Sequence, residues 1–294
     1  MTESRYSLSE RLPHYFRLAR LHRPIGILLL MWPTLWALWI AAGGFPPWHV
    51  LLIFLAGTVL MRSAGCVIND FADRDFDGHV ERTVDRPIVT GHVTPGEALC
   101  VAGILAAAAL FLVLFLDGLV IALSVPAVLI AASYPYTKRF LAIPQAYLGI
   151  AFGFGIPMAF AAIRGEVPCE AWVMLLANVF WAVAYDTEYA MVDRPDDLKI
   201  GIKSAAITFG RHDVRAVMTC YGLTLATLAV AGWMAGLGPL YYTVGLIGAA
   251  GVAHYHYGLI RERDRAGCFR AFLHNNWFGA VVFAGIVFDL LFRA

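Results

Sequence analysis

An apolar run over residues 49–68 ends in the stretch Asn-Asp-Phe-Ala-Asp-Arg-Asp-Phe-Asp at residues 69–77. Asn69, Asp73 and Asp77 follow one another at steps of four, and Asp70 precedes Asp73 by three. A helix that continued through this stretch would carry all four side chains on one face. The sequence therefore predicts a helix that leaves an apolar environment with a polar, acidic face.

A second acidic stretch, Tyr185 to Asp197, lies at the end of another apolar run. Its polar residues again fall near helical spacing: Asp186, Tyr189, Asp193, Asp196 and Asp197. Eleven of the 21 Asp and Glu residues lie within residues 70–85 and 186–197. This concentration suggests that the two stretches face each other and form one site.

The composition indicates a polytopic membrane protein. Of 294 residues, 60% are hydrophobic and 15% are charged, and the mean hydropathy is +0.69, which is outside the range of soluble domains. A net charge of +1, without a basic tail, argues against nucleic acid as a partner. No feature of the sequence suggests an obligate protein partner.

Nine apolar windows are long enough to cross a bilayer, which takes roughly 20 helical residues. They are residues 24–42, 49–68, 97–116, 118–134, 143–163, 170–187, 214–235, 238–258 and 271–291. Because only helices satisfy their backbone within such a window, the sequence predicts an all-α bundle of nine transmembrane helices. We expect a single domain over residues 1–294.

The distribution of Lys and Arg predicts the orientation. Nearly all of them lie before the first window and in alternate loops, whereas only Arg164 and Arg293 lie on the other side and Arg62 lies within a span. By the positive-inside rule, the N-terminus and both acidic stretches are cytoplasmic. Residues 1–23 interleave five arginines with apolar residues and lack a cleavage site, so they are expected to form an interfacial segment.

Carboxylates and an amide without His or Cys are the ligand set that Mg²⁺ prefers. Two facing clusters could hold Mg²⁺ on a diphosphate and neutralise the charge that develops as a carbon–oxygen bond breaks. Tyr189 shares the face of the second cluster and is a substrate-binding candidate. The alternative is a solvated acidic loop without metal. The metal-ligand candidates are Asn69, Asp70, Asp73, Asp77, Asp186, Asp193 and Asp197.

Arg62 lies two helical turns before Asn69, deeper in the predicted membrane by roughly 10 Å. A charge at that depth is costly unless it is paired. Arg62 could form a salt bridge with Asp70 or Asp73, or its guanidinium could bind a substrate carboxylate or phosphate. Arg23, at the start of the first window, is either another substrate-binding cation or an anchor at the membrane surface.

Further cations follow the other windows. Tyr134 and Lys138 are four residues apart, Arg139 comes next, and Lys199 and Lys203 lie just past the second acidic stretch. These five residues are candidates for binding a diphosphate. Lys138 and Arg139 could equally be a topology signal without a substrate.

Two other patterns suggest local structure. The sequence Phe-Gly-Phe-Gly-Ile-Pro at residues 152–157 predicts an interruption of the fifth span that makes room beside it. His254 and His256 flank an aromatic residue near a predicted membrane surface, where we interpret them as interfacial residues.

Taken together, these residues resemble the UbiA superfamily of intramembrane aromatic prenyltransferases. The resemblance rests on the acidic stretch 69–77, on Arg82-Thr83 with Arg86-Pro87, on Tyr185-Asp186-Thr187 to Asp193, and on Gly201-Ile202-Lys203-Ser204. Within the superfamily, residues 23–26, 31–38 and 156–162 are similar to the bacterial 4-hydroxybenzoate polyprenyltransferases of ubiquinone synthesis. The resemblance covers nearly the whole chain.

The resemblance implies a helical bundle around a central cavity in a bacterial inner membrane. It implies Mg²⁺-dependent transfer of a polyprenyl group from its diphosphate to the carbon ortho to the phenol of 4-hydroxybenzoate. Arg62 then orients the benzoate carboxylate, Lys138 assists at the diphosphate, and Asp193 is the catalytic base. Nearby alternatives are a superfamily enzyme that acts on a naphthoate or a haem precursor and, from a different class, a secondary transporter.

Pro195 stands where relatives commonly have an acid. Proline removes one helical hydrogen bond and disfavours the α conformation of the residue before it. We therefore expect the sixth helix to break near Asp193, with Asp196 and Asp197 starting a new turn.

Overall fold

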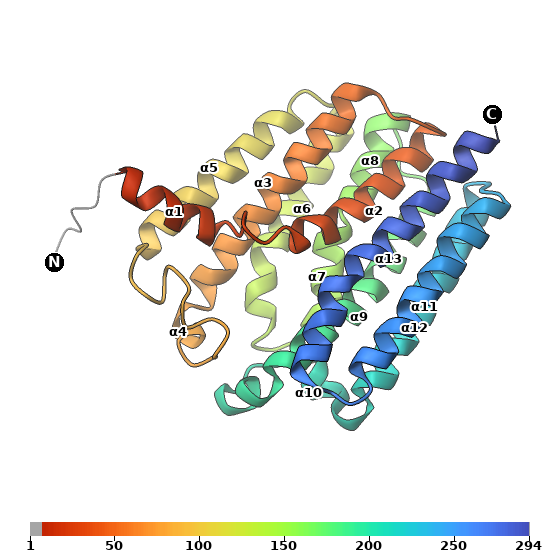
Figure 1. Cartoon of the computed structure of the whole chain (residues 1–294). Coiled ribbons are helices and arrows are strands. Elements are labelled where there is room, and N and C mark those ends of the chain that lie inside the picture. Colours follow the sequence, from red (N-terminus) through yellow and green to blue (C-terminus); the bar gives the residue numbers. More distant parts are fainter. Residues whose placement is uncertain (1–7, 294) are drawn as a thin grey trace.

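The computed structural model describes residues 8–293, and over this range every regular element is a helix (Figure 1). The first half contains α1 (Leu8–Leu18), α2 (Ile25–Ala42), α3 (Trp48–Ala72), α4 (Arg74–Asp77), α5 (Pro95–Val113), α6 (Gly118–Thr137), α7 (Pro144–Gly153) and α8 (Gly155–Arg164). The second half contains α9 (Cys169–Ile200), α10 (Ala205–Phe209), the 3₁₀ turn η1 (Gly210–His212), α11 (Asp213–Met234), the π-helical segment η2 (Tyr241–Ile247), α12 (Gly248–Ile260) and α13 (Arg265–Phe292).

Local sequence explains where several helices begin and end. The Thr94 hydroxyl accepts from the Glu97 backbone N–H, and the Glu97 carboxylate accepts from the Thr94 N–H, which forms a capping box at the start of α5. The Asp264 carboxylate accepts from the Gly267 N–H and caps α13. α9 ends at Ile200, and the next residue, Gly201, has a φ of 73°, which is readily adopted only by glycine.

The long helix α9 lies in the interior, in contact with α2, α7, α8, α11 and α13 (Figure 1). Trp181 of α9 is fully buried, with its ring centroid 5.3 Å from that of Trp36 and 5.4 Å from that of Phe278. Gly149 of α7 allows a close helix contact, because a Cβ atom there would lie 2.7 Å from Cα of Val179. Burial of these aromatic rings fixes α9 against its neighbours.

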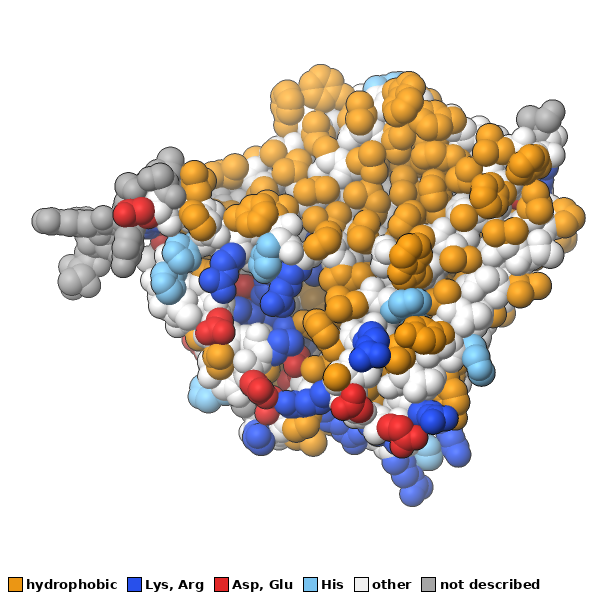
Figure 2. Space-filling model, in the orientation of Figure 1, with side chains coloured by type: hydrophobic (Ala, Val, Ile, Leu, Met, Phe, Trp, Pro, Cys, Tyr) orange, Lys and Arg blue, Asp and Glu red, His pale blue; other side chains and the backbone are white. Residues whose placement is uncertain are grey.

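Apolar side chains cover much of the outer surface (Figure 2). Phe111, Leu129 and Trp233 are 60%, 63% and 75% exposed, as expected for residues that face lipid. Within residues 8–293, seven helical segments are long and apolar enough to cross a membrane: Ile25–Ala42, Trp48–Ala72, Pro95–Val113, Gly118–Thr137, Pro144–Arg164, Ala205–Met234 and Arg265–Phe292. The protein is therefore an integral membrane protein.

The predicted number of nine spans is not confirmed. The windows at residues 170–187 and 238–258 do fold as helices, namely α9 and η2 with α12. They are not among the seven segments, because charged and polar side chains reduce the hydropathy of α9 and because α12 has only 13 residues.

The predicted break of α9 near Asp193 is wrong, because the helix runs through Pro195 to Ile200. Side-chain contacts hold the two residues that precede the proline. The Arg82 guanidinium binds the Asp193 carboxylate, and Arg194 Nη1 lies 3.1 Å from the Asp213 carboxylate. These contacts offset the lost hydrogen bond, so Asp193 and Asp197 remain one turn apart on one face.

The interruption of the fifth span is confirmed, since α7 ends at Gly153 and α8 begins at Gly155. Neighbouring side chains fill the space beside both glycines: a Cβ at Gly153 would lie 2.4 Å from Leu175 Cδ1, and one at Gly155 would lie 2.5 Å from Thr34 Oγ1. The interpretation of His256 as interfacial is wrong, because its side chain is fully buried. His254 is exposed, as expected.

Candidate active site

A cavity of about 900 Å³ lies between α2, α3, α6, α7, α8, α9 and α13. One end is polar and lies where α3 and α9 reach their C-terminal turns. The other part is apolar and extends along α3, α5 and α6, where Phe54, Leu112 and Ala131 contribute to its wall. Figure 2 shows a hollow on this face, with charged side chains gathered around it below the apolar surface. The cavity can therefore hold a molecule with an anionic head and an apolar tail.

The acidic stretch after α3 reaches the cavity although the helix does not continue unbroken. α3 ends at Ala72, Asp73 has φ −93° and ψ 3°, and α4 is a single turn. The Asp73 N–H still donates to the Asn69 carbonyl, and the Asp77 N–H donates to the Asp73 carbonyl. Asn69, Asp70, Asp73 and Asp77 consequently all line the cavity, as the spacing predicted.

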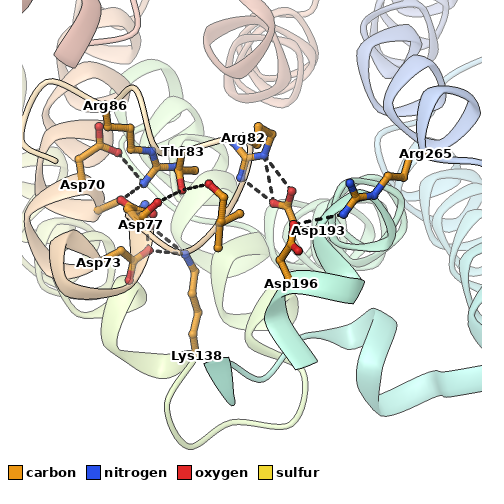
Figure 3. Close-up of polar contacts among 12 residues, drawn as sticks. Asp70, Asp73, Asp77, Arg82, Thr83, Arg86, Lys138, Asp193, Asp196 and Arg265 are labelled. Atoms are coloured by element: carbon orange, nitrogen blue, oxygen red, sulfur yellow. Dashed lines mark hydrogen bonds and ion pairs between the residues drawn. The ribbon is translucent and has the colours of Figure 1, made fainter. Parts of the chain in front are cut away.

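Lys138 joins α6 to this stretch (Figure 3). Its Nζ donates to Asp73 Oδ2 at 2.9 Å and to Asn69 Oδ1 at 3.2 Å. The Asn69 amide also donates to Asp73 Oδ2 at 3.2 Å. Tyr134, one turn earlier on α6, lies beneath the Lys138 ammonium, whose nitrogen is 5.7 Å from the ring centroid. The predicted pair therefore points at the first acidic stretch.

Two arginines that were not among the candidates neutralise Asp70 and Asp77. Arg20 Nη2 donates to Asp70 at 2.8 and 3.1 Å. Arg86 Nη1 lies 3.0 Å from Asp70 Oδ1 and also pairs with Asp77 (Figure 3). Arg86 is part of the Arg86-Pro87 motif in the sequence. Arg20 had no local signal, because it lies 50 residues from Asp70 in the chain.

The pKa of Asp77 is raised to about 6. Burial is the largest cause, because it disfavours the charged carboxylate. Arg86 acts in the opposite direction, while the neighbouring carboxylates Asp70 and Asp73 raise the pKa further. Asp77 thus belongs to a cluster whose negative charge the protein only partly neutralises.

On the opposite wall, Arg82 binds Asp193 of α9 with two nitrogens, at distances of 2.6 to 3.1 Å (Figure 3). Its guanidinium carbon lies 4.5 Å from the centroid of the Tyr189 ring, which stacks on Phe272 of α13. Arg82 comes from the segment between α4 and α5. This ion pair therefore connects the two acidic stretches.

A second contact holds the same segment outside the cavity. Arg265, at the start of α13, lies 3.0 Å from the Glu81 carboxylate. It also lies 3.2 Å from the Asp196 carboxylate (Figure 3). The Thr83 hydroxyl donates to the Asp77 carbonyl at 2.6 Å and fixes the turn. The segment 78–94 is thereby tied to α9 and α13.

Two polar atoms in the deeper wall have no hydrogen-bond partner among the described residues. They are Arg62 Nε and Tyr185 Oη, and both side chains line the cavity. Arg62 does not form the ion pair with Asp70 or Asp73 that was one alternative: its Nη1 contacts the Cys66 sulfur, and its guanidinium packs on Phe152. Gly26 allows this position, since a Cβ there would lie 2.5 Å from Arg62 Nε.

The remaining candidates divide into two groups. Arg23, Tyr189, Asp186, Asp197 and Lys203 line the cavity. Arg139 and Lys199 do not: Arg139 donates to the Ala72 carbonyl at 3.0 Å, and Lys199 lies near Asp196 on the surface.

The donor set at the polar end fits a hard divalent cation. Among the described residues no three His, Cys, Asp or Glu converge on one point, and the carboxylates instead contact Lys138, Arg82 and Arg86. These three cations offset negative charge on the carboxylates that a bound metal would otherwise neutralise. Carboxylate and amide oxygens around a cavity are suitable for Mg²⁺, which retains waters and accepts phosphate oxygens.

Known proteins resemble this chain over most of its length. A family model described as the UbiA prenyltransferase family matches residues 30–280. Proteins named 4-hydroxybenzoate octaprenyltransferase from Aromatoleum aromaticum and Azoarcus sp. are 69% and 70% identical, over 96% and 97% of this chain and 96% and 99% of their own lengths.

Solved structures share the fold. The apo structure of a UbiA homologue from Aeropyrum pernix K1 has a TM-score of 0.77 at 25% identity, and the match covers 90% of this chain and 97% of that one. A UbiA homologue from Archaeoglobus fulgidus bound to GPP and Mg²⁺ has a TM-score of 0.70 at 19% identity, with 93% and 99% covered.

Proposed function

Because the chain belongs to the UbiA prenyltransferase family, we propose that it transfers a polyprenyl group from polyprenyl diphosphate to 4-hydroxybenzoate. The new bond forms at the ring carbon ortho to the phenol, in ubiquinone biosynthesis. The names of the two relatives support this acceptor. The observation that carries the proposal is the cavity itself, which joins an end rich in carboxylates and arginines to an apolar arm.

Mg²⁺ is the proposed cofactor, in keeping with the Archaeoglobus structure bound to GPP and Mg²⁺. When bound, it would neutralise the diphosphate as the allylic carbon–oxygen bond breaks. The residues that would hold it are Asn69, Asp73, Asp77, Asp193 and Asp197, with Asp70 and Asp186 beside them.

The protein's own cations bind the diphosphate. Lys138, Arg82 and Arg86 already lie among the carboxylates, and Arg23 and Lys203 line the same cavity. Charge-assisted hydrogen bonds from these groups favour the departing diphosphate. The polyprenyl chain lies along the apolar arm, which excludes water from the allylic cation.

The acceptor binds in the deeper part of the cavity. Among the described residues, Arg62 Nε and Tyr185 Oη are buried donors without partners, and a buried donor is costly unless a ligand satisfies it. Arg62 therefore orients the benzoate carboxylate, and Tyr185 donates a second hydrogen bond to the acceptor. The phenol oxygen feeds electron density to the ortho carbon, which attacks the allylic carbon, and the Asp193 carboxylate then takes the ring proton.

We place the chain in a bacterial inner membrane with nine crossings, in which α9 and η2 with α12 complete the seven apolar segments. The N-terminus and the polar end of the cavity face the cytoplasm, in accord with the positive-inside rule. α1 lies across α3 and α5 (Figure 1), and its exposed Leu12 and Phe16 suit the bilayer surface. One domain contains the whole site.

Transfer of a labelled polyprenyl diphosphate to 4-hydroxybenzoate by the purified protein in detergent tests the proposal. Product is expected only with Mg²⁺, and Asp73→Asn should abolish it. Asp75→Asn is the matched control, because Asp75 lies on the same short turn but is 73% exposed and does not line the cavity. Lack of product with folded wild-type protein and Mg²⁺ would contradict the proposal, and product with a naphthoate instead would reassign the acceptor.

A further inference from the structure

A group of buried polar side chains lies on the side of α9 that faces away from the cavity. Glu188 of α9, Tyr221 of α11, His256 of α12 and Asn275 of α13 are each at most 1% exposed. None of the four lines the cavity. We call them the Glu188 cluster. A carboxyl group in such surroundings is costly unless hydrogen bonds or a counter-charge compensate it.

The Tyr221 hydroxyl is the centre of the cluster. Its oxygen lies 3.0 Å from Glu188 Oε1, 2.8 Å from His256 Nδ1 and 2.9 Å from Asn275 Oδ1. The other carboxyl oxygen of Glu188 accepts from the Asn275 amide at 2.8 Å. Beyond the cluster, His256 Nε2 lies 3.1 Å from His274 Nδ1.

The orientation of the Asn275 amide follows from two neighbours with fixed roles. Trp181 Nε1–H can only donate, and it lies 2.8 Å from Asn275 Oδ1. The Ala271 carbonyl can only accept, and it lies 3.1 Å from Asn275 Nδ2. Asn275 Oδ1 is therefore an acceptor, so any hydrogen between it and Tyr221 must come from the tyrosine.

Counting hydrogens then defines the protonation state of Glu188. The three contacts of the Tyr221 oxygen need three hydrogens, and the hydroxyl has one, which goes to Asn275. The second comes from His256 Nδ1–H, and His256 Nε2 in turn accepts from His274. The third must come from Glu188, so the carboxyl group is protonated and donates to Tyr221. An ionised Glu188 would leave two acceptor oxygens in contact without a hydrogen.

The chemical surroundings agree with a neutral acid. Glu188 is contacted by a hydroxyl, an amide and, at 3.9 Å, an imidazole nitrogen of His256. Because His256 is the neutral tautomer that carries its hydrogen on Nδ1, none of these three groups has a positive charge. Burial without a counter-charge favours the neutral form of a carboxyl group.

The cluster also bears on the rotation of α9. At 100° per residue, Tyr189, Asp193 and Asp186 lie about 100°, 140° and 160° around the helix axis from Glu188. All three line the cavity. Hydrogen bonds that fix Glu188 to α11 and α13 therefore also fix the direction in which these three side chains point.

We propose that Glu188 is a positioning residue which, as a neutral carboxylic acid bound to Tyr221 and Asn275, sets the rotation of α9 and aims Asp193 into the active site. Its kinetic test rests on the proposed function, whereas its protonation state can be measured without activity. Glutamine has a donor and an acceptor in the places of the protonated acid, so Glu188→Gln should retain the hydrogen bonds. Glu188→Leu removes them and leaves Tyr221 and Asn275 unsatisfied.

The experiment compares wild type, Glu188→Gln and Glu188→Leu in detergent. The infrared difference spectrum between wild type and Glu188→Gln should contain the carbonyl stretch of a protonated carboxyl group at pH 7. In the transfer assay, Glu188→Gln should keep kcat within about twofold, and Glu188→Leu should lose about 10- to 100-fold in kcat, with a smaller change in KM for the diphosphate.

Val282→Ala is the control for general destabilisation, because Val282 is buried in α13 next to η2 and is not a member of the Glu188 cluster. It should lower the melting temperature without the loss in kcat. An ionised carboxylate band, or a folded Glu188→Gln with kcat as low as Glu188→Leu, would overturn the inference. Wild-type kcat in Glu188→Leu would also overturn it, whereas an inactive wild type would contradict the proposed function and leave the infrared result to decide the protonation state.

Discussion

In the deeper wall of the cavity, Arg62 Nε and Tyr185 Oη have no hydrogen-bond partner among the described residues. Arg86 Nε, at the polar end, also has none, but the same guanidinium pairs with Asp70 and Asp77. Asp70, Asp73 and Asp193 all have cationic partners. Tyr185 is only 1% exposed, so its hydroxyl is shielded from bulk water and is available to a ligand in the cavity. At the scale of single residues, the acceptor subsite is thus marked by unsatisfied groups and the diphosphate subsite by ion pairs.

Tyr185→Phe should raise KM for 4-hydroxybenzoate about tenfold, because it removes one hydrogen bond to a charged or polar acceptor group. KM for the polyprenyl diphosphate should change little. Tyr242→Phe is the matched control, since its hydroxyl donates to the Ala229 carbonyl away from the cavity. If only the KM for the polyprenyl diphosphate changed, Tyr185 would contact the diphosphate and not the acceptor.

Asp77 predicts a pH dependence of metal binding. Its pKa is raised to about 6, chiefly by burial, so the carboxyl takes up a proton as the pH falls through that value. Because a protonated carboxyl is a poor ligand for Mg²⁺, the affinity for Mg²⁺ should fall about tenfold between pH 7 and pH 5. Calorimetric Mg²⁺ titrations at both pH values check this, and equal affinities would show that Asp77 is not a ligand. Asp77→Asn should bind more weakly with a flatter pH dependence.

At the scale of elements, the continuity of α9 was the least predictable feature. Pro195 favours a helix end by every local rule, yet Arg82 and Asp213 hold the residues before it in the helix. Arg82 and Asp213 belong to other segments of the chain, so the sequence around residue 195 gives no sign of these contacts. By contrast, the break at residues 153–155 and the end of α9 before Gly201 were set by local glycines.

Pro195→Ala should stabilise the protein by about 1 kcal/mol or more, because alanine restores the missing backbone hydrogen bond. Activity should be unchanged, since Asp193 and Asp197 already share one face. Thermal unfolding in detergent measures the first effect, and the transfer assay measures the second. A loss of activity with higher stability would mean that the proline sets the position of the two carboxylates.

Two arginines, Arg82 and Arg265, hold the segment 78–94, and their substitution should reduce activity to different extents. Arg82→Met should reduce kcat/KM for the diphosphate about 30-fold or more, because it leaves the Asp193 carboxylate, which is 13% exposed, without its partner. Arg265→Met is the matched variant, at the start of α13, because Arg265 contacts the same segment. Its partner Glu81 is 82% exposed, and its other partner Asp196 keeps its contact with Lys199, so the effect should stay within about threefold. If the two variants reduced kcat/KM equally, both arginines would act only by holding segment 78–94 in place.

At the scale of the whole molecule, the sequence predicted the bundle and the two acidic faces because apolar length and helical spacing are local properties. The partners of the acids could not be predicted in the same way. Arg20 is 50 residues from Asp70, and Arg82 is 111 residues from Asp193, so only the tertiary fold brings them together. The same limit explains His256, which lies near a predicted surface in the sequence but inside the bundle in space.

The apolar arm of the cavity predicts how the enzyme distinguishes chain lengths. Ala127 and Ala131 of α6 lie one turn apart on its wall, to which Leu112 and Leu116 from the α5 side also contribute. A large side chain at Ala127 would occupy space that a long polyprenyl chain needs and a short one does not. Ala127→Trp should therefore shift the ratio of kcat/KM values for long-chain and geranyl diphosphates about tenfold towards geranyl.

Ala132→Trp is the matched control, because Ala132 is exposed on the outside of the same helix and does not line the cavity. It should leave the ratio unchanged. Competition between the two diphosphates in one reaction measures the ratio directly, without any influence of the amount of folded protein. If Ala127→Trp left the ratio as in wild type, the polyprenyl chain would have to leave the polar end by another route, between α2 and α13 or along the surface of α3.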